Sequence, residues 1–260
     1  MLKVRVIPTL LWKQFGLVKG VGFDSWRRVG PVLPAIKVYN QREVDELILV
    51  DILAHKLDEN PDFESIEEFG QDCFVPLTVG GGIICIDQVQ KLLRAGADKI
   101  SINSAAYERP ELVTEIAKRH GAQCVVSSID VRVEPDGSWK CFSHAGTRAT
   151  GQEVCAWARE IEDRGAGEIL ITCIARDGTM QGYDLALIEA VACAVKIPVI
   201  ASGGAGSYQH MVDAVTKAGA SAVAAASMFH FTDQTPAGAK AALAAEGVPV
   251  RKPFMTSWTN

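Results

Sequence analysis

The sequence has no hydrophobic run long enough to cross a membrane and no large excess of charge of one sign. Its longest unbroken apolar stretches are far shorter than the ~20 residues that a transmembrane helix needs. Residues 1–30 contain no basic start followed by an apolar centre and a small-residue cleavage site, so we expect no signal peptide. The formal net charge is −5 over 260 residues, which argues against a general binder of nucleic acid or of membranes. Any phosphate chemistry must therefore depend on local sites.

Patterns that hold disulfides or metal ions are also missing. The seven cysteines stand singly, with no CxxC pair, and the five histidines form neither an HxxxH nor an HExxH pattern. An odd number of isolated thiols is typical of a reduced, cytoplasmic protein rather than of a disulfide-linked or zinc-binding one. We therefore predict a cytoplasmic protein without a metal site, and we expect no cofactor.

What the sequence does contain is a regular alternation of short, β-rich apolar runs with amphipathic helical stretches. Helical periodicity marks residues 86–97, 109–122 and 151–167. The eight apolar runs are KVRVIPTL, ELILVDI, CFVPLTV, DKISIN, QCVVSSID, GEILITCI, IPVIAS and SAVAAAS. Buried strands that alternate with helices imply parallel βαβ units, and eight such units predict an α/β protein with the (β/α)8 architecture of a TIM barrel. A doubly wound open sheet is the rival architecture, but no GxGxxG pattern follows the first strand.

The chain also repeats itself at half its length. VPLTVGGG at residues 75–82 aligns with IPVIASGG at residues 197–204, an offset of 197 − 75 = 122 residues, and other strand ends align at offsets close to this. The repeat predicts one barrel domain over residues 1–260 that is built from two similar halves, about 1–122 and 123–250. The alternative explanation is that all βα units resemble one another.

Glycines and small polar residues follow the predicted strands three, four, seven and eight, where a barrel of this type carries its active site. Glycines there let the backbone approach a ligand, and free amides at the start of a following helix favour an anion. The paired placement predicts two phosphate sites that face each other across the barrel mouth, although tight turns before helices would explain any one glycine run. The first site would contain Gly82, Asn103 and Ser104, and the second Gly204, Ala226, Ser227 and Gly178.

Two aspartates and one lysine are candidates for the chemistry at this mouth. Asp130 completes an apolar strand and faces the predicted anion-lined cavity, which makes it a general acid/base candidate. Asp177 follows the sixth strand, where it is either a second such group or a turn residue before Gly178. Lys19 lies on the long loop after the first strand, from which it can reach a phosphate or a reacting oxygen; an ordinary surface lysine is the alternative.

The opposite end of the barrel carries a second set of charges. Arg5, Glu46, Lys99 and Glu168 stand at the starts of four different predicted strands. Arg5 and Leu11 share one face of the first strand and lie ~20 Å apart, at ~3.3 Å per residue. Two basic and two acidic residues at the strand starts predict a ring of ion pairs that closes the bottom of the barrel. From the sequence alone such a ring is interpreted as structural.

These features resemble a known family. The stretches VGGGI, ADKISINSAA, SSID, RGAGEILIT, RDGTMQGYD, IASGGAG and AASMFHF closely resemble the cyclase subunit of imidazole glycerol phosphate synthase, in histidine biosynthesis, and the likeness covers nearly the whole chain. The resemblance implies a (β/α)8 barrel that forms a heterodimer with a glutaminase subunit docked at its bottom face. It also implies that ammonia passes through the barrel to a bisphosphate substrate at the top.

The resemblance also implies roles for individual residues. The four charges at the strand starts match the gate where ammonia enters, and Asp98 matches a position at the glutaminase interface. Lys19 and Asp130 match active-site positions. The phosphate-binding pattern of the family is matched by Gly82, Asn103, Ser104, Asp177, Gly178, Ser202, Gly204, Ala226 and Ser227.

The opening stretch departs from the family pattern. The cyclase has an aspartate at the end of strand one, in a pattern like CLDV, whereas this chain has TLLW and places Leu11 there. Asp130 is then without its partner, because a leucine cannot transfer protons. Loss of one member of a concerted acid/base pair costs several orders of magnitude in rate. Ala175 also stands where the family usually has an aspartate.

The segments IPTLLWKQFGLVK and NQREVDELILVDI resemble a branch of the family found with genes for surface glycans such as lipopolysaccharide. That branch implies an ammonia-delivering subunit, which works with a glutaminase and a sugar amidotransferase to form an acetamidino group on a nucleotide-linked sugar. We take this function as the sequence-based hypothesis, because ammonia delivery needs the charged gate but not two carboxylates. The alternatives are a true cyclase that makes imidazole glycerol phosphate and AICAR despite Leu11, a non-catalytic activator of the glutaminase, and a related sugar isomerase.

Overall fold

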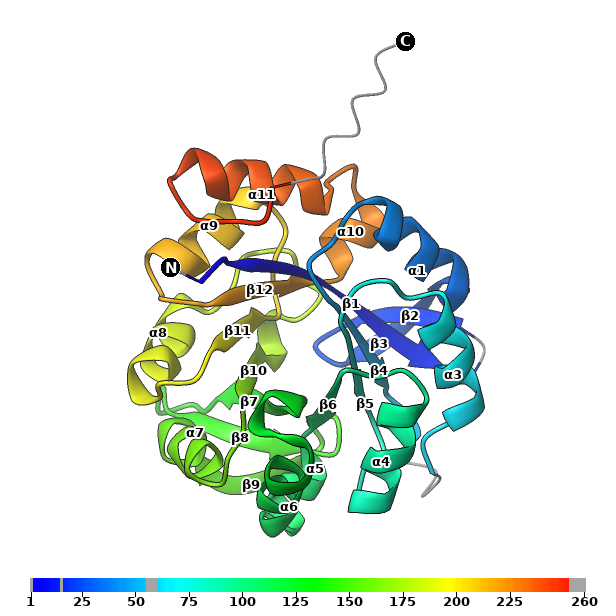
Figure 1. The fold of residues 1–260 in the computed structure, drawn as a ribbon. Helices are drawn as coiled ribbons and strands as arrows, with labels where there is room; N and C mark the ends of the chain where they lie inside the picture. Colours follow the sequence, from blue (N-terminus) through cyan, green and yellow to red (C-terminus); the bar gives the residue numbers. More distant parts are fainter. Residues whose placement is uncertain (1, 15, 55–59, 253–260) are drawn as a thin grey trace.

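The chain folds into a closed barrel of eight parallel strands surrounded by helices, as predicted (Figure 1). The structure is a computed structural model, and it describes residues 2–14, 16–54 and 60–252. In the order in which they pair around the barrel, the strands are β1 (Arg5–Lys13), β4 (Leu47–Asp51), β5 (Leu77–Gly80), β6 (Lys99–Ile102), β7 (Val125–Val133), β10 (Glu168–Cys173), β11 (Val199–Ser202) and β12 (Ala222–Ala225), which pairs with β1 again. All carboxyl ends therefore lie at one end of the barrel.

Helices cover the outside of the barrel in Figure 1. The longer ones are α1 (Val32–Gln41), α3 (Phe63–Gln71), α4 (Ile86–Arg94), α6 (Glu111–His120), α7 (Val154–Asp163), α8 (Leu185–Ala194), α9 (Tyr208–Thr216) and α11 (Pro236–Ala245). Two five-residue helices, α5 (Ser104–Glu108) and α10 (Ser227–Phe231), follow β6 and β12 directly. Among the residues that the structure describes, no helix is long and apolar enough to cross a bilayer.

The first connection is a β-hairpin, so the prediction of a loop there was wrong. β2 (Gly16–Val21) pairs antiparallel with β1, where Leu11 lies opposite Val18, and β3 (Asp24–Gly30) pairs with β2. The hairpin escaped prediction because glycines interrupt its apolar pattern. One of them, Gly20, is required by close packing, since a Cβ there would lie 1.9 Å from the carbonyl oxygen of Asp24.

A second hairpin follows the fifth barrel strand. Its turn lies at Asp136 and Gly137, as the Asp-Gly pair in the sequence predicts: Gly137 has φ +83°, and an Asp136 carboxylate oxygen accepts a hydrogen bond from the amide of Ser138. β7 continues past Asp130 and pairs with β8 (Trp139–Ser143), so the prediction that Asp130 ends its strand was wrong. β9 (Arg148–Glu153) occupies the start of the helix predicted at 151–167, and α7 begins only at Val154. The two hairpins follow the first strand of each predicted half.

The interior of the barrel is filled by apolar side chains. Alternate residues of β1 point inward, with Arg5 at the base and Leu11 at the mouth, six residues apart on the same face. Between these two levels lies a buried cluster made of Ile7, Ile48, Val126, Leu170, Ile200, Ala222 and Ala224. A larger cluster packs the outer faces of the strands against the helices. The barrel thus has a charged base, an apolar middle and a polar mouth.

Candidate functional site

The carboxyl ends of the strands surround a cavity of about 320 Å³. Every residue predicted for the mouth lines this cavity: Lys19, Gly82, Asn103, Ser104, Asp130, Asp177, Gly178, Ser202, Gly204, Ala226 and Ser227. These residues come from both predicted halves of the chain. The fold therefore brings together the phosphate-site and acid/base candidates that the sequence analysis identified separately.

Asp130 lies in the wall of the cavity and is buried, with 8% of its surface exposed. One of its carboxylate oxygens accepts a hydrogen bond from the side-chain amide of Asn103 at 3.1 Å. Burial, with the negative charge of Asp177 as the second cause, raises the pKa of Asp130 to about 7. A carboxyl group with this pKa can both give and take a proton near neutral pH.

Lys19 is also buried, with 3% of its surface exposed, although it lies on a hairpin that begins at the surface. Its ammonium group donates to a carboxylate oxygen of Asp177 at 2.5 Å. The hairpin is held against the loop after β10 by a hydrogen bond from the Gly22 amide to the Asp177 carbonyl. A Cβ on Gly178 would lie 2.1 Å from the carbonyl oxygen of Gly20, so the two loops touch through their backbones. The buried cation is therefore paired, as its burial requires.

The two predicted phosphate sites have matching backbone geometry. The glycine pairs that follow β5 and β11 all have positive φ: Gly81 +107°, Gly82 +67°, Gly203 +83° and Gly204 +109°. Asn103 and Ala226, which precede α5 and α10, have φ/ψ of −118°/−85° and −124°/−68°. The resemblance between the halves therefore extends to the loop conformation at each site.

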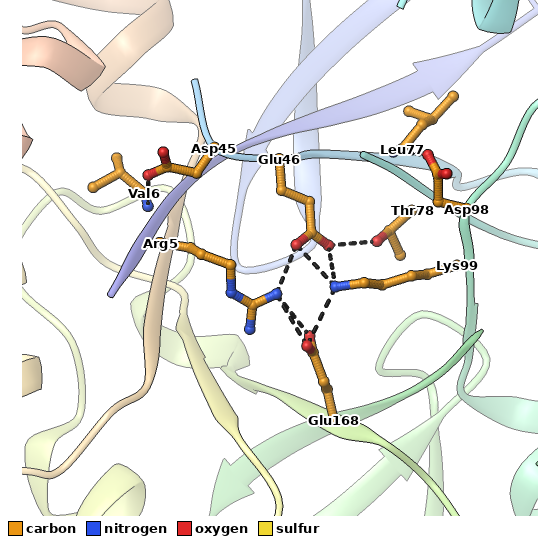
Figure 2. Close-up of polar contacts among 9 residues, drawn as sticks. All are labelled: Arg5, Val6, Asp45, Glu46, Leu77, Thr78, Asp98, Lys99 and Glu168. Atoms are coloured by element: carbon orange, nitrogen blue, oxygen red, sulfur yellow. Dashed lines mark hydrogen bonds and ion pairs between the residues drawn. The ribbon is translucent and has the colours of Figure 1, made fainter. Parts of the chain in front are cut away.

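The base of the barrel holds the predicted ring of charges (Figure 2). Arg5 pairs with Glu46 at 2.6 Å and with Glu168 at 3.0 Å, while Lys99 pairs with the same two carboxylates at 2.9 and 3.2 Å. The hydroxyl of Thr78 donates to Glu46, which is 1% exposed. Burial alone would lower the pKa of Arg5, but the charges of Glu168 and Glu46 outweigh it and raise that pKa. Each charge in the ring has two partners of opposite sign.

Asp98 lies beside this ring at the base, on the loop before β6. It is exposed, and one carboxylate oxygen accepts a hydrogen bond from the amide of Leu77 at 2.8 Å. Its side chain thus supports the start of β5 at the face where the resemblance places the glutaminase. Within the described residues, no group of three or more His, Cys, Asp or Glu side chains is placed to hold a metal ion.

Comparison with known proteins assigns the family. Residues 5–235 match the family described as histidine biosynthesis protein. This chain belongs to that family. A curated relative, imidazole glycerol phosphate synthase subunit HisF of Hyphomonas neptunium (strain ATCC 15444), is 49% identical over 251 residues, which cover 96% of this chain and 99% of the relative. The histidine biosynthesis family and its cyclase subunit are thus supported, whereas the surface-glycan branch is not shown.

Leu11 lines the cavity of this histidine biosynthesis family member at the end of β1. The neighbouring β4 ends in a carboxylate, Asp51, but one of its oxygens accepts hydrogen bonds from the amides of Leu53 and Ala54. Asp51 therefore caps its own loop. The strand-one side of the mouth presents an apolar side chain.

His144 is a cavity residue that the sequence analysis missed. It lies between β8 and β9 with φ +53°, and its amide donates to the hydroxyl of Ser104 at 3.0 Å. Its ring nitrogen Nε2 lies 3.4 Å from Glu108 of α5. The hairpin after β7 thus reaches the first predicted phosphate site. The sequence signal is a histidine in the hairpin after the fifth barrel strand, and residue spacing does not show where such a hairpin folds relative to the cavity.

Proposed function

We propose that this chain is the synthase subunit of an imidazole glycerol phosphate synthase, which uses ammonia to form imidazole glycerol phosphate and release AICAR. The observation that carries the proposal is the presence, in one barrel, of an ion-pair ring at the base and a buried acid/base residue between two matched glycine loops at the mouth. The relative named HisF, which matches this chain over its length, supports the same conclusion.

The base of the barrel would receive ammonia from a glutaminase subunit. The ring of Arg5, Glu46, Lys99 and Glu168 stands across the axis, and the apolar cluster lies above it. An apolar interior disfavours the ammonium ion far more than neutral ammonia, because an unpaired buried charge is costly. The ring and the interior together would select the neutral form for transfer to the mouth.

The mouth would hold a substrate with two phosphates. One phosphate would contact the loop of Gly82, Asn103 and Ser104, and the other the loops of Gly178, Ser202, Gly204, Ala226 and Ser227. Asp130 lies between the two sites and would transfer protons during ring closure. Lys19 would close the cavity from above.

The direct test supplies the purified chain with ammonium salt at alkaline pH and the bisphosphate substrate of the cyclase, and follows AICAR release. We expect catalytic turnover without the glutaminase subunit, because ammonia in solution can reach the mouth. Omission of ammonia is the matched control. Absence of turnover above the rate without protein would contradict the proposal.

The gate is tested with the same chain in complex with a glutaminase subunit and glutamine. Lys99→Ala breaks two ion pairs of the ring, at 2.9 and 3.2 Å. We expect glutamine hydrolysis to continue while AICAR release per glutamine falls by about tenfold, equivalent to ~1.4 kcal/mol. Turnover with external ammonia serves as the control for the mouth. Unchanged coupling in the Lys99→Ala complex would remove the gate role.

Leu11 favours a second candidate function. A subunit that only delivers ammonia to a sugar amidotransferase, for acetamidino formation on a nucleotide-linked sugar, would need the ring at the base but no acid at strand one. Under this function the chain fails to close the imidazole ring, yet supports amidine formation when mixed with the amidotransferase, a glutaminase and glutamine. The ammonia assay above therefore distinguishes the two candidates.

A further inference from the structure

The cavity contains more titratable groups than the phosphate and gate assignments explain. Among the described residues, those that line it are Lys19, Asp51, Glu108, Asp130, His144 and Asp177. Ring closure with ammonia needs proton transfer in both directions, yet position 11 is a leucine. One of the remaining groups must act with Asp130 if the proposed function is correct.

Three of these groups are poorly placed for that role. Asp51 accepts hydrogen bonds from two backbone amides of its own loop. Glu108 is exposed at the outer edge, where it lies near Arg148 and His144 at 3.5 and 3.4 Å. His144 is held by this carboxylate and by the Ser143 hydroxyl. These side chains belong to the wall of the first phosphate site.

Asp177 is placed differently. It is 9% exposed, it lines the cavity, and it follows β10, which pairs with β7 so that Thr172 lies opposite Asp130. Both carboxyl groups line the same cavity, and the charge of Asp177 is one cause of the raised pKa of Asp130. A phosphate ligand is a poor explanation for a carboxylate at this position, because like charges repel. The amide of Gly178 could serve a phosphate without it.

Lys19 connects this carboxylate to the side of the mouth that lacks an acid. β2 lies beside β1, and Val18 of β2 is the partner of Leu11. From the next residue, Lys19, the side chain reaches across to Asp177. The ammonium and the carboxylate form an ion pair in the wall of the cavity. The hairpin from strand one thus prepares a proton acceptor on the opposite wall.

We propose that Asp177, held by Lys19, performs the proton transfer that position 11 cannot perform. This inference rests on the proposed cyclase function. When ammonia adds to an electrophilic carbonyl carbon, the carbon–nitrogen bond forms and the π pair moves to oxygen. Protonated Asp130 gives its proton to that oxygen, and the carboxylate of Asp177 takes one proton from nitrogen. The product is a neutral carbinolamine, and one proton has moved from Asp130 to Asp177.

The test uses Asp177→Asn, which keeps the size of the side chain and removes its basicity. With external ammonia we expect kcat to fall by about 100-fold or more, as for loss of a general base, with little change in KM. Leu11→Asp added to this variant should recover about tenfold or more of the lost kcat. Leu11→Asn is the matched control and should recover none, because it adds a polar group without a proton to exchange.

A second measurement follows the pH dependence of kcat in the same variants. Removing the charge of Asp177 should lower the pKa of Asp130, so the limb assigned to Asp130 should move to lower pH. If Asp177→Asn does not fold, Lys19→Gln replaces it, with the same expected fall in kcat and the same rescue by Leu11→Asp.

Three outcomes overturn the inference while leaving the proposed function intact. They are a kcat within about threefold of the parent chain, a rise in KM alone, which indicates a binding role, and equal rescue by Leu11→Asn. Absence of turnover in the parent chain overturns the proposed function and, with it, the role of Asp177.

Discussion

The two ends of the barrel solve the problem of buried charge in opposite ways. At the base, two cations and two carboxylates contact one another, and each has two partners. At the mouth, the buried Asp130 contacts the neutral side-chain amide of Asn103, and the buried Asp177 pairs with the single cation of Lys19. The charges of the ring at the base neutralise one another, whereas the polar groups at the mouth are still available to bind a ligand.

This difference explains why a leucine is tolerated at one end and would not be at the other. Removing a charge from the base leaves its partners buried and unpaired, which is expensive. Leu11 at the mouth carries no charge, so its presence in the cavity wall leaves no buried charge without a partner. Changes in function are therefore expected at the mouth, while the base remains fixed by its own electrostatics.

The largest expected effect comes from a substitution at the mouth. Asp130→Asn should lower ammonia-dependent kcat by about 10³-fold, because the variant can neither give nor take a proton. Asp136→Asn, on the exposed turn of the adjacent hairpin, is the control and should retain the parent rate. In the parent chain the Asp130 limb of the rate profile should lie near pH 7 rather than near 4. Retained activity in Asp130→Asn would remove this residue from the mechanism.

The same variant should change the pH dependence of stability. The pKa of Asp130 is raised in the folded state, from 3.8 to about 7, so the folded protein binds the proton more tightly than the unfolded chain. Its contribution to stability is present below pH 4 and is lost as pH rises through 7, by on the order of 4 kcal/mol. Urea unfolding at pH 5 and pH 8 measures somewhat more than half of this loss, because the unfolded chain is already largely ionised at pH 5. Asp130→Asn should lack it, and an identical pH dependence in both proteins would contradict the prediction.

The next largest effect comes from a substitution in the ion-pair ring at the base. Glu46→Gln removes a carboxylate that contacts Arg5 and Lys99, and it should reduce the free energy of unfolding by about 3 kcal/mol. Glu115→Gln makes the same chemical change in an exposed ion pair with Arg109 and should cost less than ~1 kcal/mol. Urea unfolding checks both variants. Equal losses would mean that burial of the ring contributes nothing.

The smallest expected effect tests the contact between the Lys19 hairpin and the loop after β10. Gly178 and Gly137 have similar backbone angles, φ +77° and +83°, but only at Gly178 would an added methyl group lie 2.1 Å from a carbonyl oxygen. Gly137→Ala should cost ~1 kcal/mol from the backbone alone. Gly178→Ala should cost ~2 kcal/mol more, because the hairpin that carries Lys19 must move. It should also lower ammonia-dependent kcat, whereas Gly137→Ala should not; equal behaviour would show that the hairpin is not held at Gly178.

Much of this architecture could be predicted from the sequence because it depends on periodicity. The strand–helix alternation predicted the barrel, and the positions of Asp130, Gly82 and Gly204 towards the carboxyl ends of their apolar runs predicted one shared cavity, even though β7 continues past Asp130. Arg5 and Glu168 each stand at the start of a predicted strand, and this position predicted that both lie at the base of the barrel. Position along a barrel strand fixes the height of a side chain on the axis, so such residues can be located without coordinates.

What escaped prediction lies on segments whose path is set by tertiary contacts. Lys19 was placed on a loop, although it lies on a strand buried against β1 and the loop after β10. The pairing of Lys19 with Asp177 joins residues 158 positions apart through a hairpin. His144 reaches Ser104 in the same way. Neither contact has a periodic signature, because a hairpin can fold over a barrel in many directions.

The hairpins that follow β1 and β7, together with the two glycine loops, place similar backbone geometry on two sides of the mouth, as the predicted repeat would. Symmetry of this kind offers a ligand with a phosphate at each end two orientations, turned end for end, of similar binding energy. Leu11 and Asp130 lie on the two strands that precede these hairpins, so they make the orientations chemically unequal. A molecule seated one way presents its reacting carbon to a carboxyl group, and seated the other way presents it to a hydrocarbon wall. The presence of leucine rather than a carboxylic acid at position 11 thus makes only one orientation of such a ligand suitable for reaction.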